Sequence, residues 1–231
     1  MEPSIPAAQG SGLKGAIRVA EPDRTQRAIV RRTAETRATV PDLELQTEIE
    51  MGAAIALADE SDCSITAILT RACALALRAC PEANAAYRDG RYELYSRVNV
   101  GVVMQTENAY VTPTVLDADS KSLLELSREL EGLAERARAH KLTPPELAGT
   151  TFTLSDLTAH AVHRWSALVT PPQAAALTAG AIRAAPVARD GRLVPSQIMS
   201  VTLGCDHRIL FGNRAAAFLG QIVGSIERAT G

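Results

Sequence analysis

Aromatic residues are scarce in this sequence: tryptophan, tyrosine and phenylalanine together make up 3% of the 231 residues. Basic side chains are not in excess either, because 24 lysines and arginines stand against 26 aspartates and glutamates. Proteins that bind nucleic acid rely on basic surfaces and on aromatic platforms that stack on bases. The composition therefore argues against a nucleic-acid partner.

Cysteines and long apolar runs are also few. The four cysteines, Cys63, Cys73, Cys80 and Cys205, form no C-x-x-C pair, so their spacing fits neither a zinc site nor a disulfide scaffold. No apolar run approaches the roughly 20 residues that a membrane span requires. The N-terminus lacks the basic-then-apolar order of a secretory signal. We therefore expect a soluble cytoplasmic protein with no metal and no membrane partner.

An ordered succession of strand and helix patterns runs through the rest of the chain. Residues 43–51 alternate strictly between apolar and polar, which predicts a strand with one wet face. From Ser64 the apolar residues recur at helical spacing. The pairs at 89–90 and 190–191 read Asp-Gly and predict hairpin turns. Because hairpins interrupt any purely alternating scheme, one α/β domain with a mixed sheet fits best.

The two ends of the chain differ in character. Residues 1–23 are rich in proline, glycine, alanine and serine and lack periodicity, so we interpret them as a flexible N-terminal segment. No second block of composition appears between residues 24 and 231, which we interpret as one domain. Near its end, the stretch LGCDHRILFGNRAAAFL places His207 between Asp206 and Arg208, where a strand pattern stops.

Histidine at such a position suits proton transfer. The unperturbed pKa of imidazole is about 6.5, close to neutral pH, so the ring can act as a general base. A lone histidine at the end of a strand is usually structural or solvated, however. The assignment of a catalytic role therefore depends on the motifs around it.

The succession of motifs resembles the catalytic domain of the dihydrolipoamide acyltransferases, the cores of 2-oxo acid dehydrogenase complexes. The segments that carry the resemblance are RAIVRRTAETRATVP, VNVGVVMQTENAYVTPTVLDADSKSLLELSREL, KLTPPELAGTTFTLSDL, TPPQAAALTAG and SVTLGCDHRILFGNRAAAFL. The resemblance covers residues 24–231 and implies a fold like that of chloramphenicol acetyltransferase, an α/β two-layer sandwich in which a mixed sheet packs against helices. It also implies a homotrimer whose active sites lie between subunits.

The resemblance further assigns roles to two residues. His207 matches the general base of the family's D-H-R-x-x-D-G motif, and Ser155 matches the hydroxyl residue that stabilises the tetrahedral intermediate. Acetyl-CoA is the expected co-substrate, and no covalent enzyme intermediate is required. A hydroxyl donor aimed at an oxyanion contributes roughly 3 kcal/mol to the stability of the transition state.

The sequence departs from the family at two points. Phe211 stands where the motif has an aspartate that orders the active-site loop through an ion pair. The residues before Arg24 are too few to hold a lipoyl domain, so no lipoyl group is expected on this chain. We therefore predict a stand-alone natural-product acetyltransferase that moves acetyl from acetyl-CoA to a small-molecule hydroxyl, specifically that of a tetronate-like polyketide.

Two alternatives stay open. The chain can be a dihydrolipoamide acyltransferase core that works with lipoyl domains in trans, or an inactive scaffold that keeps the fold for assembly. His160 and His163 have i, i+3 spacing but no third ligand for a metal, so they are interpreted as surface or loop residues. His140 is interpreted as a residue at the end of a helix, where a positive charge suits the helix dipole. Arg27, Arg31 and Arg32 either touch CoA phosphates or form a solvated or intersubunit helix face.

Overall fold

The structure is a computed structural model. It describes residues 11–229 apart from 14, 18 and 107–109. The helices are α1 (Arg24–Thr39), α2 (Gly52–Ser61), α3 (Ile65–Ala79), α4 (Leu123–Arg138) and α5 (Gly212–Glu227), with short 3-10 turns at Pro81–Ala83, Ala118–Ser120 and Pro144–Leu147. The strands are β1 (Ser11–Gly12), β2 (Gly15–Ala16), β3 (Asp42–Glu50), β4 (Ala85–Arg88), β5 (Arg91–Leu94), β6 (Val100–Gln105), β7 (Tyr110–Val111), β8 (Thr114–Val115), β9 (Phe152–Asp156), β10 (Ala175–Ala179), β11 (Arg183–Arg189) and β12 (Arg192–Asp206).

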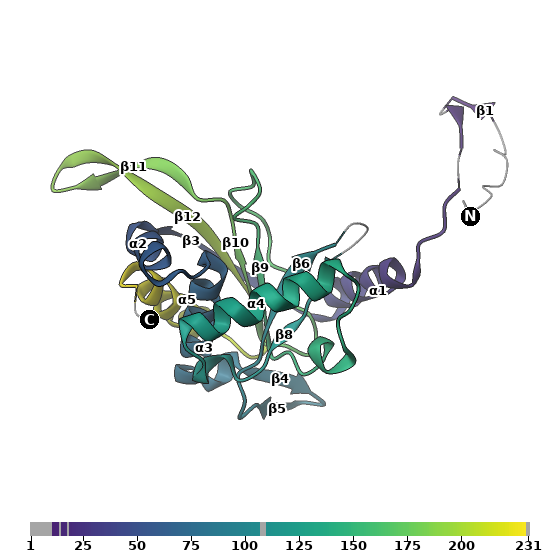
Figure 1. Ribbon diagram of the computed structural model, residues 1–231. Coiled ribbons are helices and arrows are strands. Elements are labelled where there is room, and N and C mark those ends of the chain that lie inside the picture. Colours follow the sequence, from purple (N-terminus) through teal and green to yellow (C-terminus); the bar gives the residue numbers. More distant parts are fainter. Residues whose placement is uncertain (1–10, 14, 18, 107–109, 230–231) are drawn as a thin grey trace.

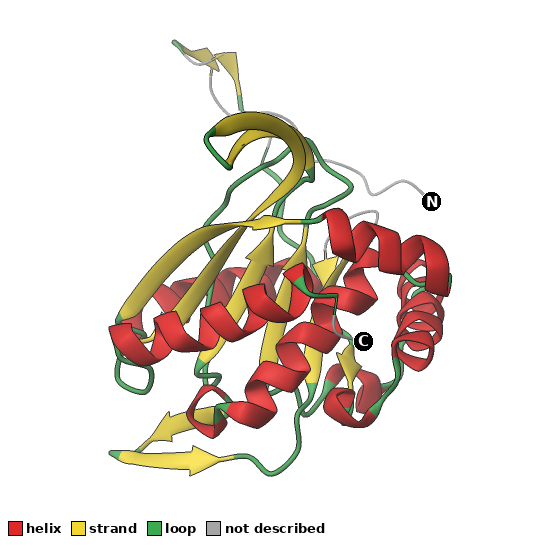
Figure 2. Cartoon of the chain, turned by 90° about the vertical axis from the view of Figure 1, so that its left-hand side faces the viewer, coloured by secondary structure: helices red, strands yellow, loops and turns green. Residues whose placement is uncertain are grey.

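One mixed sheet forms the centre of the molecule (Figure 1). Strand β9 runs parallel to both β6 and β10, whereas β12 pairs antiparallel with β3, β10 and β11. Helices α2 to α5 gather on one face of this sheet (Figure 2). The prediction of a two-layer α/β fold with a mixed sheet is therefore confirmed.

Local sequence signals account for most of these elements. The alternation in β3 places Ile49 in the core while Gln46 and Glu48 remain exposed. Helix α3 begins after Ser64, whose side chain accepts a hydrogen bond from the amide of Ala67. Helix α4 begins with a capping box between Ser122 and Glu125. The two Asp-Gly pairs form the turns that join β4 to β5 and β11 to β12.

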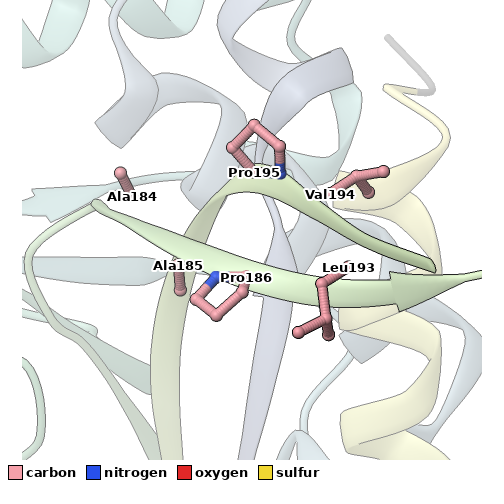
Figure 3. Close-up of a pocket in the computed structure, with 6 residues that line it drawn as sticks. All are labelled: Ala184, Ala185, Pro186, Leu193, Val194 and Pro195. Carbon is pink, nitrogen blue, oxygen red and sulfur yellow. The ribbon is translucent and has the colours of Figure 1, made fainter.

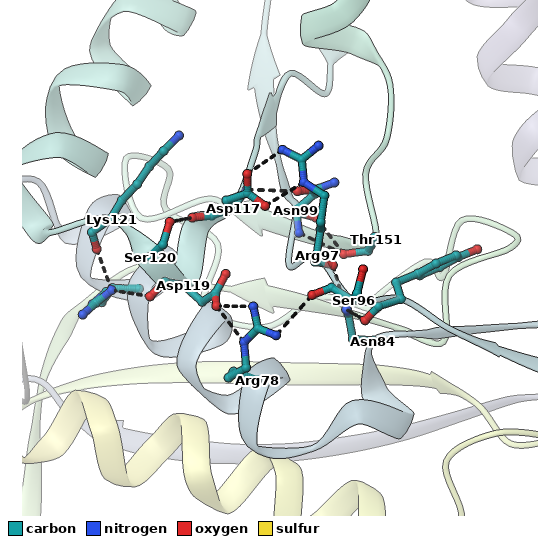
Figure 4. A network of polar contacts seen from close by, with 12 residues as sticks. Arg78, Asn84, Ser96, Arg97, Asn99, Asp117, Asp119, Ser120, Lys121 and Thr151 are labelled. Atoms are coloured by element: carbon teal, nitrogen blue, oxygen red, sulfur yellow. Dashed lines mark hydrogen bonds and ion pairs between the residues drawn. The ribbon is translucent and has the colours of Figure 1, made fainter.

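A polar network joins α3 to the segment between β8 and α4 (Figure 4). Arg78 pairs with Asp119 at 2.6 Å and Arg97 pairs with Asp117 at 2.5 Å. The buried side chain of Asn99 accepts from the amide of Asp117 and donates to the carbonyl of Gly149. Hydrogen bonding to Arg97 lowers the pKa of Asp117 below its usual value. The network therefore ties the residues before β6 and the turn after β8 to α3.

The crossover between β9 and β10 lies over the sheet face opposite the helices. Arg164 in this crossover pairs with Glu48 at 2.7 Å and donates to the hydroxyl of Ser200. Buried Gly180 lets the crossover approach closely, because a Cβ there would collide with the carbonyl oxygen of His163. Close packing at this point holds the crossover against β10 and β12.

Replacement of Gly180 by alanine is expected to destabilise the protein by about 1–3 kcal/mol, because the crossover must move away from the sheet. The matched control is Gly220→Ala on the exposed side of α5, where a new Cβ meets nothing within 4 Å. That change is expected to stabilise the protein by about 0.5–1 kcal/mol. Thermal unfolding of the two variants measures the contrast, and equal melting temperatures would contradict the close packing.

The predicted flexible segment 1–23 falls partly outside the described residues, since residues 1–10 are not described. Residues 24–231 were predicted to form one domain, and that division remains a prediction. Within the described residues, no helix is both long and apolar enough to cross a membrane.

Candidate active site

His207 lies directly after the last residue of β12. The turn is fixed by main-chain bonds: the amide of His207 donates to the carbonyl of Pro41 at 2.9 Å, and that of Asp206 donates to Ala174 at 2.8 Å. Ile209 and Leu210 both donate to the carbonyl of Asp206, and their side chains are buried. The imidazole of His207 is exposed. A rigid turn therefore presents the imidazole at the molecular surface.

The residues on either side of His207, Asp206 and Arg208, form an ion pair that two tyrosines contact. Buried Asp206 accepts from the guanidinium of Arg208 at 2.9 and 2.6 Å, and this bonding raises the pKa of Arg208. The same guanidinium lies 4.8 Å from the ring centre of Tyr87, within cation–π range. The hydroxyl of Tyr92 donates to the carbonyl of Arg208 at 2.9 Å. The β4–β5 hairpin thus supports the turn that carries His207.

Phe211 follows at the N-cap of α5. Its ring lies edge-to-face with the imidazole of His207, with 6.0 Å between centroids and an interplanar angle of 68°. The phenyl ring is 52% exposed. The contact is an aromatic one, at the position where the family motif has a charged aspartate.

Ser155 lies in β9, between β6 and β10 in the sheet, and its side chain is half-buried. Strand register places Ser155 beside Thr178 of β10, which lies beside Thr202 of β12. The hydroxyl of Thr178 donates to main-chain carbonyls of Trp165 and Thr202, whereas no hydrogen bond to Ser155 Oγ is found among the described residues. The Ser155 hydroxyl is therefore available for another partner.

Ser155 and His207 of the same chain lie far apart. His207 is five residues beyond Thr202 and two strands away from Ser155. At about 3.3 Å per residue and about 4.8 Å between strands, that offset is about 16 Å along the sheet and about 10 Å across it. One chain therefore does not bring both groups to the same reacting atom.

The other predicted residues lie on the surface of the chain. His140, His160 and His163 are exposed. Within the described part of the chain, no group of three or more histidine, cysteine, aspartate or glutamate side chains is placed to hold a metal. Arg27, Arg31 and Arg32 lie on exposed parts of α1.

Cysteine chemistry does not suit this site. Burial raises the pKa of Cys205, two residues before His207, to about 12, and the nearby carboxylate of Asp206 adds to the effect. Burial also raises the pKa of Cys73 to about 12. Because the thiolate is the nucleophilic form, neither sulfur is a reactive nucleophile near neutral pH.

The described surface has hollows at the β11–β12 hairpin and at the end of β6 and β9. The first, of about 380 Å³, lies on the projecting β11–β12 hairpin and is lined by Ala184, Ala185, Pro186, Leu193, Val194 and Pro195 (Figure 3). Its lining side chains are all apolar, so they supply no proton acceptor. The second, of about 270 Å³, is lined by Val103, the register partner of Ser155, and by Asp156. This second hollow lies on the helical side of the sheet, because Thr66 of α3 and Leu130 of α4 also line it. The side chain of Ser155 lies on the other face, since its strand neighbour Asp156 bonds to Thr66.

Comparison with solved structures defines the class of fold. Dihydrolipoamide acetyltransferase from Azotobacter vinelandii superposes with a TM-score of 0.87 and 24% identity, covering 99% of this chain and 98% of that one. Chloramphenicol acetyltransferase superposes with a TM-score of 0.58 and 16% identity, covering 85% and 92%. The predicted fold like that of chloramphenicol acetyltransferase is therefore confirmed.

Sequence comparison defines the family. The profile of the 2-oxoacid dehydrogenases acyltransferase (catalytic domain) matches residues 15–231. The chain therefore belongs to this family, and the prediction of an acyltransferase is confirmed.

Curated relatives resemble the chain over most of its length. The dihydrolipoyllysine-residue acetyltransferase component of pyruvate dehydrogenase complex from Rickettsia bellii is 30% identical over 220 residues, which are 91% of this chain and 53% of that protein. Component 2 of the mitochondrial complex from Arabidopsis thaliana is 36% identical over 167 residues, 71% of this chain and 31% of that protein. The chain spans about half the length of the Rickettsia relative and less of the Arabidopsis one.

The predicted natural-product acetyltransferase acting on a tetronate-like hydroxyl is wrong. The relatives named above are components of pyruvate dehydrogenase complexes, in line with the first alternative. The incorrect prediction relied on Phe211 and on the residues before Arg24. A base and an oxyanion donor serve thiol and hydroxyl acceptors alike, so the motifs at His207 and Ser155 did not distinguish the two acceptors.

Proposed function

We propose that this chain is the catalytic core of a dihydrolipoamide acetyltransferase, which moves an acetyl group between CoA and the thiol of a dihydrolipoyl group. The observation that carries the proposal is the 30% identity with such a component over 91% of the chain. The place of His207, exposed on a rigid turn after β12, supports a role for this residue in the reaction.

In the proposed mechanism, His207 acts as the general base. A neutral imidazole nitrogen accepts the proton of the attacking thiol, and the sulfur attacks the thioester carbonyl of the donor. The hydroxyl of Ser155 donates a hydrogen bond to the oxyanion that forms. When the intermediate collapses, the leaving thiolate takes the proton back from the imidazolium. Proton and charge therefore balance, and no acyl-enzyme forms.

The proposed site is shared between two subunits of a homotrimer. The separation of Ser155 from His207 within one chain supports this arrangement, because the two groups can meet only across a subunit boundary.

The exposure of helix α1 in the single chain also supports a homotrimer, in which a neighbouring subunit would cover the helix. Among the α1 side chains that the structure describes, only Thr36 is buried, and Val30 is 63% exposed. A helix of 16 residues is only marginally stable in water without tertiary contacts.

The Azotobacter vinelandii structure comes from an investigation of a serine, a histidine and an asparagine in the catalytic mechanism of that enzyme. The same two residue types, Ser155 and His207, are the proposed catalytic pair here. In that enzyme the asparagine is four residues after the histidine, and here Phe211 occupies this interval. The proposed pair is therefore shared, while the third position differs.

Acetyl transfer from labelled acetyl-CoA tests the acceptor. With dihydrolipoamide, kcat/KM is expected to be at least about 100-fold higher than with the matched diol in which both sulfurs are replaced by oxygen. The reason is that a thiol loses its proton to imidazole far more readily than an alcohol does. Preferential acetylation of the diol would contradict the thiol acceptor. Failure to turn over acetyl-CoA with either acceptor would favour the inactive scaffold.

A further inference from the structure

Among the described residues, the imidazole of His207 makes a ring contact with Phe211 and no side-chain hydrogen bond. In the part of the chain that the structure describes, neither imidazole nitrogen has a hydrogen-bond partner. The ring contact that does exist is with Phe211, edge-to-face at 6.0 Å. Edge-to-face pairs at this distance are favourable and directional. The main-chain turn fixes the backbone of His207, and the contact with Phe211 restricts rotation of the imidazole about its side-chain bonds.

Phe211 is itself held at a defined position. It is the N-cap residue of α5, in extended conformation with φ −76° and ψ 156°. The amide of Ala215 donates to the carbonyl of Phe211 at 2.9 Å. The side chains of Leu210, directly before Phe211, and of Ala215, four residues after it, are buried. The phenyl ring therefore projects from a fixed backbone toward His207.

Phenylalanine is an unfavourable choice for the local structure here. An N-cap residue normally supplies a side-chain oxygen to the first turn of its helix, and Phe211 makes no such bond. In the single chain the ring also remains 52% exposed. A residue that breaks local preferences without a local gain marks a functional position, and the contact with His207 supplies that function.

We propose that Phe211 is a positioning residue for His207, holding the imidazole by an edge-to-face aromatic contact in place of a hydrogen bond. The inference deepens the proposed function, because it assigns how the base is oriented. It concerns the ring alone, since the main chain of His207 is already fixed by its bond to Pro41.

Three variants separate aromatic positioning from packing and from helix capping. Phe211→Leu keeps an apolar side chain, and Phe211→Ser supplies the missing cap. Both are expected to lower kcat for acetyl transfer about 2- to 10-fold with KM nearly unchanged, as expected from loss of one aromatic pair. Phe211→Tyr keeps the aromatic contact and is expected to retain kcat within about twofold. Phe211→Ser is also expected to raise the melting temperature by about 2–4 °C, because it caps α5.

A spectroscopic measurement reports the contact without relying on activity. The chain has four histidines, so labelling histidine ring carbons with ¹³C gives a simple NMR spectrum, and His207→Gln identifies the signal of His207. In Phe211→Leu the His207 signal is expected to shift, because the ring current of the phenyl group is lost. The signals of the exposed His140, His160 and His163 are expected to stay in place.

The outcomes distinguish this inference from the proposed function. An unmoved His207 signal in Phe211→Leu overturns the positioning role, whatever happens to activity. A fall in kcat accompanied by a lower melting temperature in all three variants would mean that Phe211 only supports the fold, and also overturns the inference. A wild-type protein without acetyl transfer contradicts the proposed function, while the NMR signal still tests the contact.

Discussion

Replacement of His207 by alanine is expected to lower kcat for acetyl transfer to dihydrolipoamide at least about 100-fold, the lower end for loss of a general base. The thiol acceptor then has to lose its proton to water, whose basicity is far below that of imidazole. The side chain of His207 is exposed, so the change in unfolding free energy is expected to stay within about 0.5 kcal/mol. Initial rates at saturating acetyl-CoA measure the effect.

His163→Ala is a matched control for the His207 variant. This histidine is also exposed and lies in the crossover between β9 and β10. Its carbonyl, rather than its imidazole, is the group that packs against Gly180, so alanine is expected to leave kcat unchanged. Near-normal turnover of the His207 variant would remove this residue from the mechanism.

The elements with strong periodic signals were predictable from the sequence. Alternation in β3 and helical spacing in α3 each reflect burial of one side of an element. The structure has β3 over Asp42–Glu50 and begins α3 directly after Ser64. Helix α2 was not predicted, because its N-cap is Met51 and no side chain caps it. Nothing in the sequence marks where that helix begins.

The surroundings of His207 were only partly predictable. The motif itself suggested His207 and Ser155, and both remain predictions about catalysis. The tyrosines that brace the turn carry no local signal, since Tyr92 and Arg208 are separated by 116 positions in the chain. The sequence marks Phe211 as a departure from the family motif, but the edge-to-face contact with His207 depends on how the turn folds. Contacts of this kind follow from tertiary structure and produce no periodic pattern in the amino-acid sequence.

Replacement of Ser155 by alanine is expected to lower kcat about 100-fold or more, because one donor to the oxyanion is worth about 3 kcal/mol. Since no described residue bonds to Ser155 Oγ, its loss leaves no protein group unsatisfied and little change in stability is expected. Ser166→Ala is the control: its hydroxyl lies in the crossover and bonds to Glu44 at 3.3 Å. Equal losses in the two serine variants would contradict a specific role for Ser155.

Mixing the two inactive variants tests whether the site is shared between subunits. In a trimer assembled from equal amounts of His207→Ala and Ser155→Ala chains, each site takes its histidine from one chain and its serine from the next. About a quarter of the sites then combine two intact groups, so about a quarter of the wild-type activity is expected to return. If both groups came from the same chain, every site would lack one of them and mixing would restore nothing. The separation of Ser155 from His207 along the sheet favours the first result.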